Sequence, residues 1–290
     1  MAVPDDIAEA TNRIGRDAEM PSIIEMANRY TLLQEREPYV GLDVVRDLFY
    51  GPDERHRLDV FRAADQVGEP KPVFIFVHGG GFIGGDKSMP GAPFYDNVCV
   101  WAARSGLIGV NITHRLAPQH PWPAGAEDLS AAVDWVKANI AAHGGDPERV
   151  FVSGTSAGAV HVASYLSGPY GAADKVAGAI LLACLFDMPT CVRDHYFLAY
   201  FGEDESRYAE QSTLKGMAET TVPVLLAVAE YDPIDYERQA LLYVNAFWEK
   251  QGRLPNLIRL MVHNHFTLAF HLNTGDAYLG EQMLEFIRRA

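Results

Sequence analysis

Short strand-like runs recur between residues 44 and 262; those from residue 73 onward are nearly continuous and apolar, and helical patterns alternate with them. Such runs are typical of strands buried on both faces of a sheet. Their alternation with helices predicts an α/β fold, in which helices cover both faces of a mostly parallel sheet of about eight strands. The runs that we interpret as strands are Val44–Phe49, Leu58–Arg62, Val73–Val77, Leu107–Ile112, Val150–Val152, Val176–Phe186, Val222–Ala229 and Leu257–Val262.

Apolar residues at helical spacing predict helices at both ends of the chain. This pattern covers residues 7–18 and 23–30 before the first strand, and residues 279–287 after the last one. No repeat, low-complexity tract or linker divides the chain, so we predict a single domain over residues 1–290. Within it we expect residues 1–38 to form an N-terminal helical cap segment, and residues from about 187 to 217 to form a short lid insertion.

The charge and the cysteines exclude several classes of function. The chain has 24 Lys and Arg against 38 Asp and Glu, which gives a net charge of −14. Binding to nucleic acid needs a basic protein face, so we expect no nucleic-acid partner. Its three cysteines show neither a CxxC pair nor metal-ligand spacing, so we expect no disulfide framework and no metal site. The N-terminus lacks the pattern of a secretory signal, and the longest apolar run is about half a membrane span. We expect a soluble, cytoplasmic protein; its oligomeric state, a homo-oligomer included, stays open.

The segment GTSAG at residues 154–158 matches the pattern GxSxG. It directly follows the apolar run Val150–Val152 and precedes the helix-compatible stretch AVHVASYL. In this context the pattern is typical of a nucleophile elbow, a tight strand-to-helix turn in which glycines avoid clashes around a strained serine. The alternative is a glycine-rich turn with an incidental serine. We interpret Ser156 as a nucleophile.

A second glycine-rich segment, HGGGF at residues 78–82, follows the apolar run Val73–Val77. Acyl transfer needs backbone N–H donors aimed at the oxygen that becomes negative, and glycines let the main chain approach closely. Gly80 and Gly81, with the residue after the nucleophile, Ala157, would supply three such donors. A flexible turn is the alternative, but HGGG followed later by GxSxG is hard to attribute to chance.

The acid and the base of a triad should follow the serine in that order. The segment EYDPID comes after the run Val222–Ala229, and we choose Asp232 because it lies just past the strand. Glu230 is still close to the strand, and Asp235 is a candidate helix cap.

The base should follow the last predicted strand, where the chain reads MVHNHF. We choose His265 as the general base toward Ser156, oriented by Asp232. The alternative base is His263. If it is not the base, it lies at the strand end or contacts the site residues without taking part in the reaction.

Three segments together resemble a known group of enzymes. HGGGF, HRLAPQHPWPAGAEDLSAAVDWV and GGDPERVFVSGTSAG are similar to segments of the hormone-sensitive-lipase-like esterases and the feruloyl-esterase-like carboxylesterases. YFGEDESRYAEQSTL and NHF resemble the second group more, and the similarity runs from about residue 45 to 290. The resemblance implies an α/β-hydrolase fold, carboxylesterase activity on small-molecule esters and no cofactor. It also implies an oxyanion hole at Gly80 and Gly81 and a triad of Ser156, Asp232 and His265.

Three positions depart from the pattern of these families and bear on substrate preference more than on the chemistry. Thr155 stands where an acidic residue is frequent, Ala159 replaces a glycine, and His114 replaces a tyrosine. Candidate pocket residues are aromatic, and packing of the core is the alternative for each. They are Phe82, Trp122, Tyr196, Phe197, Tyr200 and Phe201. With a short lid, we favour small or aromatic esters over long-chain triglycerides.

Two other functions fit the same motifs. An arylformamidase or other amidase would use the same triad, and a preference for N-formyl-kynurenine over nitrophenyl esters would identify it. A non-catalytic ligand-binding protein on this fold typically lacks a triad residue, whereas this chain has a plausible Ser, Asp and His.

Overall fold

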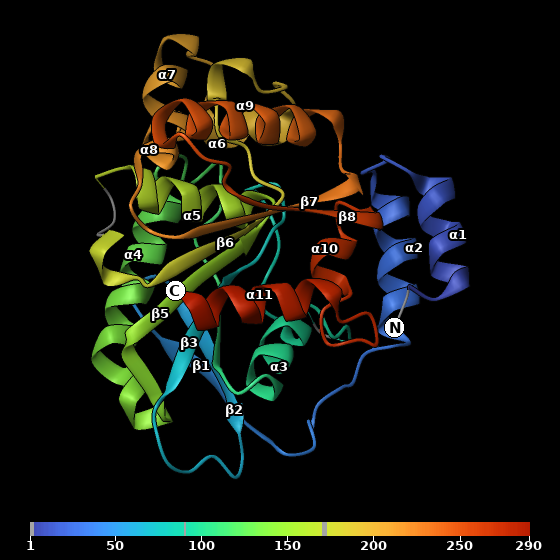
Figure 1. Ribbon diagram of the computed structural model, residues 1–290, viewed down its shortest axis with the longest axis vertical. Helices are drawn as coiled ribbons and strands as arrows, with labels where there is room; N and C mark the ends of the chain where they lie inside the picture. Colours follow the sequence, from blue (N-terminus) through green and yellow to red (C-terminus); the bar gives the residue numbers. More distant parts are fainter. Residues whose placement is uncertain (1–2, 90, 170–172) are drawn as a thin grey trace.

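The computed structural model describes residues 3–89, 91–169 and 173–290. An eight-stranded sheet with the order β1-β2-β4-β3-β5-β6-β7-β8 forms the centre of the molecule (Figure 1). Strand β2 pairs antiparallel with both of its neighbours, and strands β3 to β8 all run parallel. The strands are β1 Leu42–Phe49, β2 Arg57–Ala63, β3 Lys71–Val77, β4 Ile108–Ile112, β5 Gly145–Thr155, β6 Gly178–Leu182, β7 Val224–Tyr231 and β8 Asn256–Asn264.

Each of the eight runs that we interpreted as a strand overlaps one strand of the structure, so the α/β prediction is confirmed. The longest run forms only the five-residue β6, and its remainder continues as a buried loop up to Phe186. Strands β4 and β6 are buried along their whole length, because helices cover both faces of the sheet. This double burial explains why their sequences are apolar without alternation.

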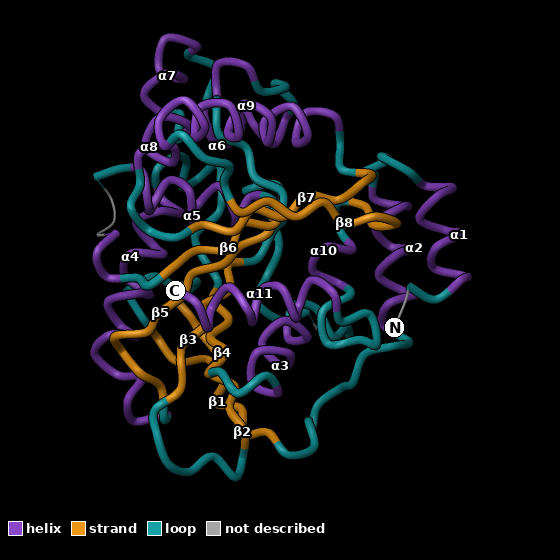
Figure 2. Tube along the Cα trace, in the orientation of Figure 1, coloured by secondary structure: helices purple, strands orange, loops and turns teal. Residues whose placement is uncertain are grey.

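The sheet separates two apolar cores, one on each of its faces. Helices cover both faces (Figure 2). Helices α4, α5 and α9 contribute to one core, whereas α3, α10 and α11 contribute to the other. Their bounds are α3 Asp96–Arg104, α4 Ala124–Asn139, α5 Ala157–Ser167, α9 Ile234–Gln251, α10 Thr267–Phe270 and α11 Tyr278–Arg289. The described residues also form the 3₁₀ turns η1 Ile140–His143, η2 Ala173–Lys175, η3 Met188–Thr190 and η4 Glu205–Arg207.

Short helices occupy the two segments that the sequence marks as additions. Between β6 and β7 lie α6 His195–Phe201, α7 Tyr208–Gln211 and α8 Leu214–Glu219, grouped near α9 (Figure 1). At the N-terminus, α1 Asp5–Ile14 and α2 Met20–Thr31 pack beside β8 and α10, around Met26 and Phe270. Among the described residues, no helix is both long and apolar enough to cross a membrane.

Candidate active site

Ser156 occupies the turn between β5 and α5. Its backbone has φ 54° and ψ −121°, a conformation that side-chain-bearing residues rarely adopt. A Cβ atom on Gly154 would lie 2.4 Å from the carbonyl group of Gly158, and one on Gly158 would lie 2.2 Å from the carbonyl oxygen of Val77. The two glycines of GTSAG are therefore required by close packing, as expected for a nucleophile elbow.

Three side chains form a continuous hydrogen-bonded chain at the carboxyl ends of parallel strands. Nε2 of His265, which follows β8, lies 2.9 Å from Oγ of Ser156. Nδ1 of His265 lies 2.8 Å from Oδ1 of Asp232, which follows β7. Asp232 is fully buried, and its second oxygen accepts from the N–H of Ala229 at 2.6 Å. Because an ionised carboxylate can only accept, Nδ1 carries the proton and Nε2 presents its lone pair to the serine.

Glu230 and Asp235, the alternative acids, and His263, the alternative base, make contacts outside the triad. Glu230 accepts a hydrogen bond from the N–H of Val262 and so joins β7 to β8. Asp235 accepts from the N–H of Val192. His263 lies 2.9 Å from Asp276 and does not contact Ser156. The geometry therefore places Asp232 and His265, rather than their alternatives, beside the serine.

The HGGG loop runs directly against the elbow. A Cβ atom on Gly79 would lie 3.3 Å from Cβ of Ser156, and one on Gly80, at φ 132°, would lie 2.1 Å from the carbonyl oxygen of Gly84. Ala157 is the first residue of α5, and N–H groups in the first turn of a helix have no acceptor within the helix. Backbone from the loop and from the helix start thus borders the same reacting atom.

Three buried histidines pack together beside this loop: His78, its first residue, and His114 and His161. The rings of His78 and His114 stack with centroids 4.3 Å apart, and the ring of His161 meets His114 edge-on at 4.5 Å. Burial lowers the pKa of all three imidazoles, so they stay neutral. His114, which replaces the expected tyrosine, therefore continues an aromatic stack under the loop.

Sequence reasoning missed two residues at this site. Oη of Tyr236, in the first turn of α9, lies 3.2 Å from Oγ of Ser156, and its ring centroid lies 4.5 Å from that of His265. Arg16, which follows α1, donates a hydrogen bond to the backbone carbonyl of Asp232 and pairs with Glu237 at 2.9 Å. The only sequence signal for Tyr236 is its place four residues after Asp232, and no signal indicated Arg16.

Of the six aromatic pocket candidates, Tyr200 and Phe201 are buried, and the other four differ in their positions. Phe82 is 5% exposed and stacks on Tyr200, and Phe197 packs among buried aromatic rings. Trp122 borders a separate cavity of about 190 Å³ beside the C-terminal half of α5. Tyr196 is 37% exposed, and its ring covers Gly81, whose Cβ would lie 2.4 Å from Cδ1 of the ring. Tyr196 thus contacts the HGGG loop through this glycine.

A sequence model of the alpha/beta hydrolase fold matches residues 74–253, which is more than half of the chain and includes the HGGG loop, the elbow and Asp232. The chain belongs to this family. His265 lies beyond the matched segment. We assign it to the site from its distances to Ser156 and Asp232.

Named relatives share shorter segments. The esterase LipC of Mycobacterium tuberculosis is 36% identical over 113 residues, 39% of this chain and 27% of LipC. The carboxylesterase NlhH of Mycobacterium tuberculosis is 44% identical over 88 residues, 30% of this chain and 26% of NlhH. The chain thus matches about a quarter of the length of these relatives.

Solved structures share the whole fold. Esterase B from Lactobacillus rhamnosis superposes with a TM-score of 0.74 at 16% identity, over 99% of this chain and 96% of that one. The hyperthermophilic esterase from Pyrobaculum calidifontis gives 0.70 at 21% identity, over 100% and 99% of the two chains. At these identities the likeness shows the α/β-hydrolase fold alone.

Proposed function

We propose that this protein is a serine carboxylesterase that hydrolyses small or aromatic esters without a cofactor. The observation that carries the proposal is the pair of hydrogen bonds from Ser156 to His265 and from His265 to Asp232, at 2.9 and 2.8 Å. Both distances lie in the range that proton transfer needs. The esterases among the sequence relatives support the same interpretation.

In the proposed reaction, Oγ of Ser156 attacks the ester carbonyl while Nε2 of His265 takes the hydroxyl proton. The N–H groups of Gly80, Gly81 and Ala157 stabilise the oxyanion of the tetrahedral intermediate. The imidazolium then protonates the departing alcohol, which leaves an acyl-serine. A water molecule repeats the sequence with His265 as base, so the acid is released and Ser156 regains its proton. Asp232 stabilises the imidazolium in both halves.

Two rival functions are tested by one substrate panel. Purified protein is assayed with p-nitrophenyl acetate, butyrate and octanoate, phenyl acetate and N-formyl-kynurenine, and is labelled with a fluorophosphonate probe. We expect labelling at Ser156 and the highest kcat/KM on short or aromatic esters. A preference for the formamide would identify an amidase instead, and absence of both labelling and turnover would indicate a non-catalytic protein. That the protein is cytoplasmic stays a prediction.

Tyr196 is expected to limit the size of the substrate, because its partly exposed ring lies against the oxyanion loop. We propose that α6, which carries it, forms part of a lid. Replacing Tyr196 with alanine should raise kcat/KM for p-nitrophenyl octanoate relative to acetate by about 10-fold or more, the effect of accommodating at least one further methylene group. The ratio is measured on both esters with the same preparation. An unchanged ratio would place the size limit elsewhere.

A further inference from the structure

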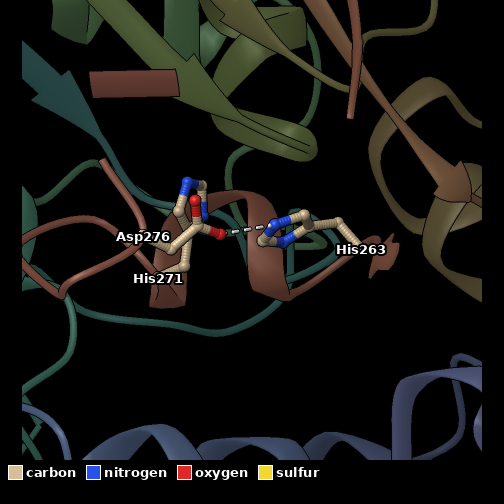
Figure 3. A group of neighbouring side chains, drawn as sticks. All are labelled: His263, His271 and Asp276. Carbon is tan, nitrogen blue, oxygen red and sulfur yellow. Dashed lines mark hydrogen bonds and ion pairs between the residues drawn. The ribbon is translucent and has the colours of Figure 1, made fainter. Parts of the chain in front are cut away.

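Three side chains of metal-binding type meet on the C-terminal part of the chain (Figure 3). His263 lies in β8, His271 just after α10, and Asp276 in the loop before α11. One possible ligand atom of each lies within 4.8 Å of the other two. The histidines are 3% and 0% exposed, and the Asp276 side chain is 10% exposed.

Thr267 forms hydrogen bonds with Nδ1 of both His263 and His271. Nδ1 of His271 lies 2.6 Å from the carbonyl oxygen of Thr267 and must donate, because a carbonyl only accepts. The Thr267 hydroxyl donates to the carbonyl oxygen of Asn264 at 3.1 Å, so Nδ1 of His263, 3.0 Å away, donates to that hydroxyl. A neutral imidazole with its proton on Nδ1 has a lone pair on Nε2. Both rings therefore present lone pairs at Nε2.

The two Nε2 atoms differ in their partners. Nε2 of His263 lies 2.9 Å from Oδ2 of Asp276, so either a proton on Nε2 or a metal ion between the two atoms satisfies this pair. Nε2 of His271 is buried without a hydrogen-bond partner in the described part of the chain, although buried polar atoms usually have one. The cluster therefore contains three electron-pair donors, two of them oriented by hydrogen bonds behind them, as in metal sites.

We propose that His263, His271 and Asp276 bind a divalent transition-metal ion of the zinc class. Two imidazoles and one carboxylate suit this class, whereas calcium and magnesium prefer oxygen ligands throughout. Tetrahedral zinc with bonds of about 2.0–2.2 Å holds its ligand atoms roughly 3.3 Å apart. Atoms that now lie up to 4.8 Å apart can reach this spacing through side-chain shifts of about an ångström.

The ion would act as a structural clamp and would take no part in the reaction. It would join the end of β8, the end of α10 and the loop before α11. His265 lies between β8 and α10, so the clamp would stabilise the segment that presents the base to Ser156.

The test is a metal titration of the tag-free protein after dialysis against a chelator. We expect one equivalent of Co²⁺ to produce visible d–d bands of a four-coordinate site, and Zn²⁺ to displace it and raise Tm; Ca²⁺ and Mg²⁺ should do neither. His271→Gln and Asp276→Asn should each weaken Co²⁺ binding by about 100-fold or more, since loss of a supporting partner alone costs 10–100-fold.

His56→Gln is the matched control. Nε2 of His56 lies 2.9 Å from Asp128 in a similar buried pair that belongs to no three-ligand cluster of the described residues. This variant should bind Co²⁺ like the parent. If the parent fails to bind Co²⁺ or gains no stability from Zn²⁺, the proposal is wrong. In that case His263 and Asp276 share a proton instead of a metal ion. Unchanged binding in the two ligand variants overturns it as well, and the parent titration decides even where a variant fails to fold.

The hydroxyl of Tyr236 carries a second, independent inference, which rests on the proposed function. Ser156 donates its hydroxyl proton to Nε2 of His265, so its oxygen has a lone pair free for the O–H of Tyr236, 3.2 Å away. Burial raises the pKa of Tyr236, so the phenol keeps its proton and remains a donor across the working pH range.

We infer that Tyr236 is a catalytic residue that hydrogen-bonds to Oγ of Ser156 when the acyl-enzyme breaks down. In that step water attacks the acyl carbon, His265 takes the water proton and returns it to Oγ, and the bond from the acyl carbon to Oγ breaks. Negative charge develops on Oγ, where the Tyr236 donor stabilises it without losing its own proton.

Replacing Tyr236 with phenylalanine is expected to lower kcat about 10-fold, less than the 10²–10³-fold that loss of an oxyanion donor costs, because the bond is long. KM should fall in parallel, and a burst of p-nitrophenol should show that the acyl-enzyme accumulates. Because the pKa of Tyr236 is raised, parent activity should not decline as the pH rises through about 10, the ordinary tyrosine value.

Tyr243→Phe is the control on the same helix, since that buried hydroxyl has no hydrogen-bond partner among the described residues. It should leave kcat and KM unchanged. A Tyr236→Phe enzyme with parental kcat and no burst overturns the inference while leaving the esterase proposal intact. An inactive parent would instead overturn the proposed function.

Discussion

Replacing Ser156 with alanine is expected to lower kcat by on the order of 10⁴-fold or more, equivalent to about 5.5 kcal/mol of barrier. The change removes the nucleophile, while the backbone donors of the loop and the helix start remain. Residual activity therefore comes from substrate binding and the oxyanion hole alone. The measurement is kcat on p-nitrophenyl acetate, with the far-ultraviolet circular dichroism of the variant and the parent compared.

Ser153 offers a matched control in β5, three residues before Ser156. Its hydroxyl is buried and has no hydrogen-bond partner in the described residues, so Ser153→Ala makes the same chemical change away from the reaction. The control should keep parental kcat. A Ser156→Ala enzyme that hydrolyses esters nearly as fast as the parent would contradict the nucleophile assignment.

Replacing Asp232 with asparagine is expected to lower kcat by about 10³–10⁴-fold at neutral pH. The N–H of Ala229 donates to Oδ2 of Asp232 at 2.6 Å, so the amide oxygen of an asparagine must take that position. Its NH₂ group then faces Nδ1 of His265 and forces the ring to accept there. The proton moves to Nε2, which can no longer accept from Ser156.

Asp235→Asn serves as the control, because Asp235 accepts from the N–H of Val192 and pairs with Arg238, outside the triad. Its kcat should stay close to the parental value, because the Asp235 side chain contacts no residue of the triad. The kcat/KM profile between pH 6 and 9 is measured for all three proteins. Parental activity in the Asp232 variant would contradict its role as the acid.

Much of the fold could be predicted because the sheet is buried on both faces. A strand such as β4 must be apolar at every position, so it shows as a continuous run such as Leu107–Ile112. The run that ends at Phe186 shows the limit of this signal. Only its first part pairs with neighbours in β6, and the rest is apolar because it is buried as a loop.

The candidate site divides in the same way. The glycines around Ser156 and in the HGGG loop could be interpreted from the sequence because backbone contacts leave no room for a Cβ, a constraint that the sequence records directly. The choice between His263 and His265 depends on which side of the strand end each ring faces. The hydrogen bonds decide it, with Asp276 on one ring and Ser156 on the other.

By itself, the sequence determined the order of strands and helices and the positions where the main chain must pass closest to the reacting atom, because burial and steric limits act on each residue locally. Only the tertiary structure brought Tyr236 to Ser156 and brought His263, His271 and Asp276 together. These contacts join segments whose spacing follows no motif. Their distances are set by how α9 and α10 pack against the sheet that contains β7 and β8, and no local pattern of residues records this packing.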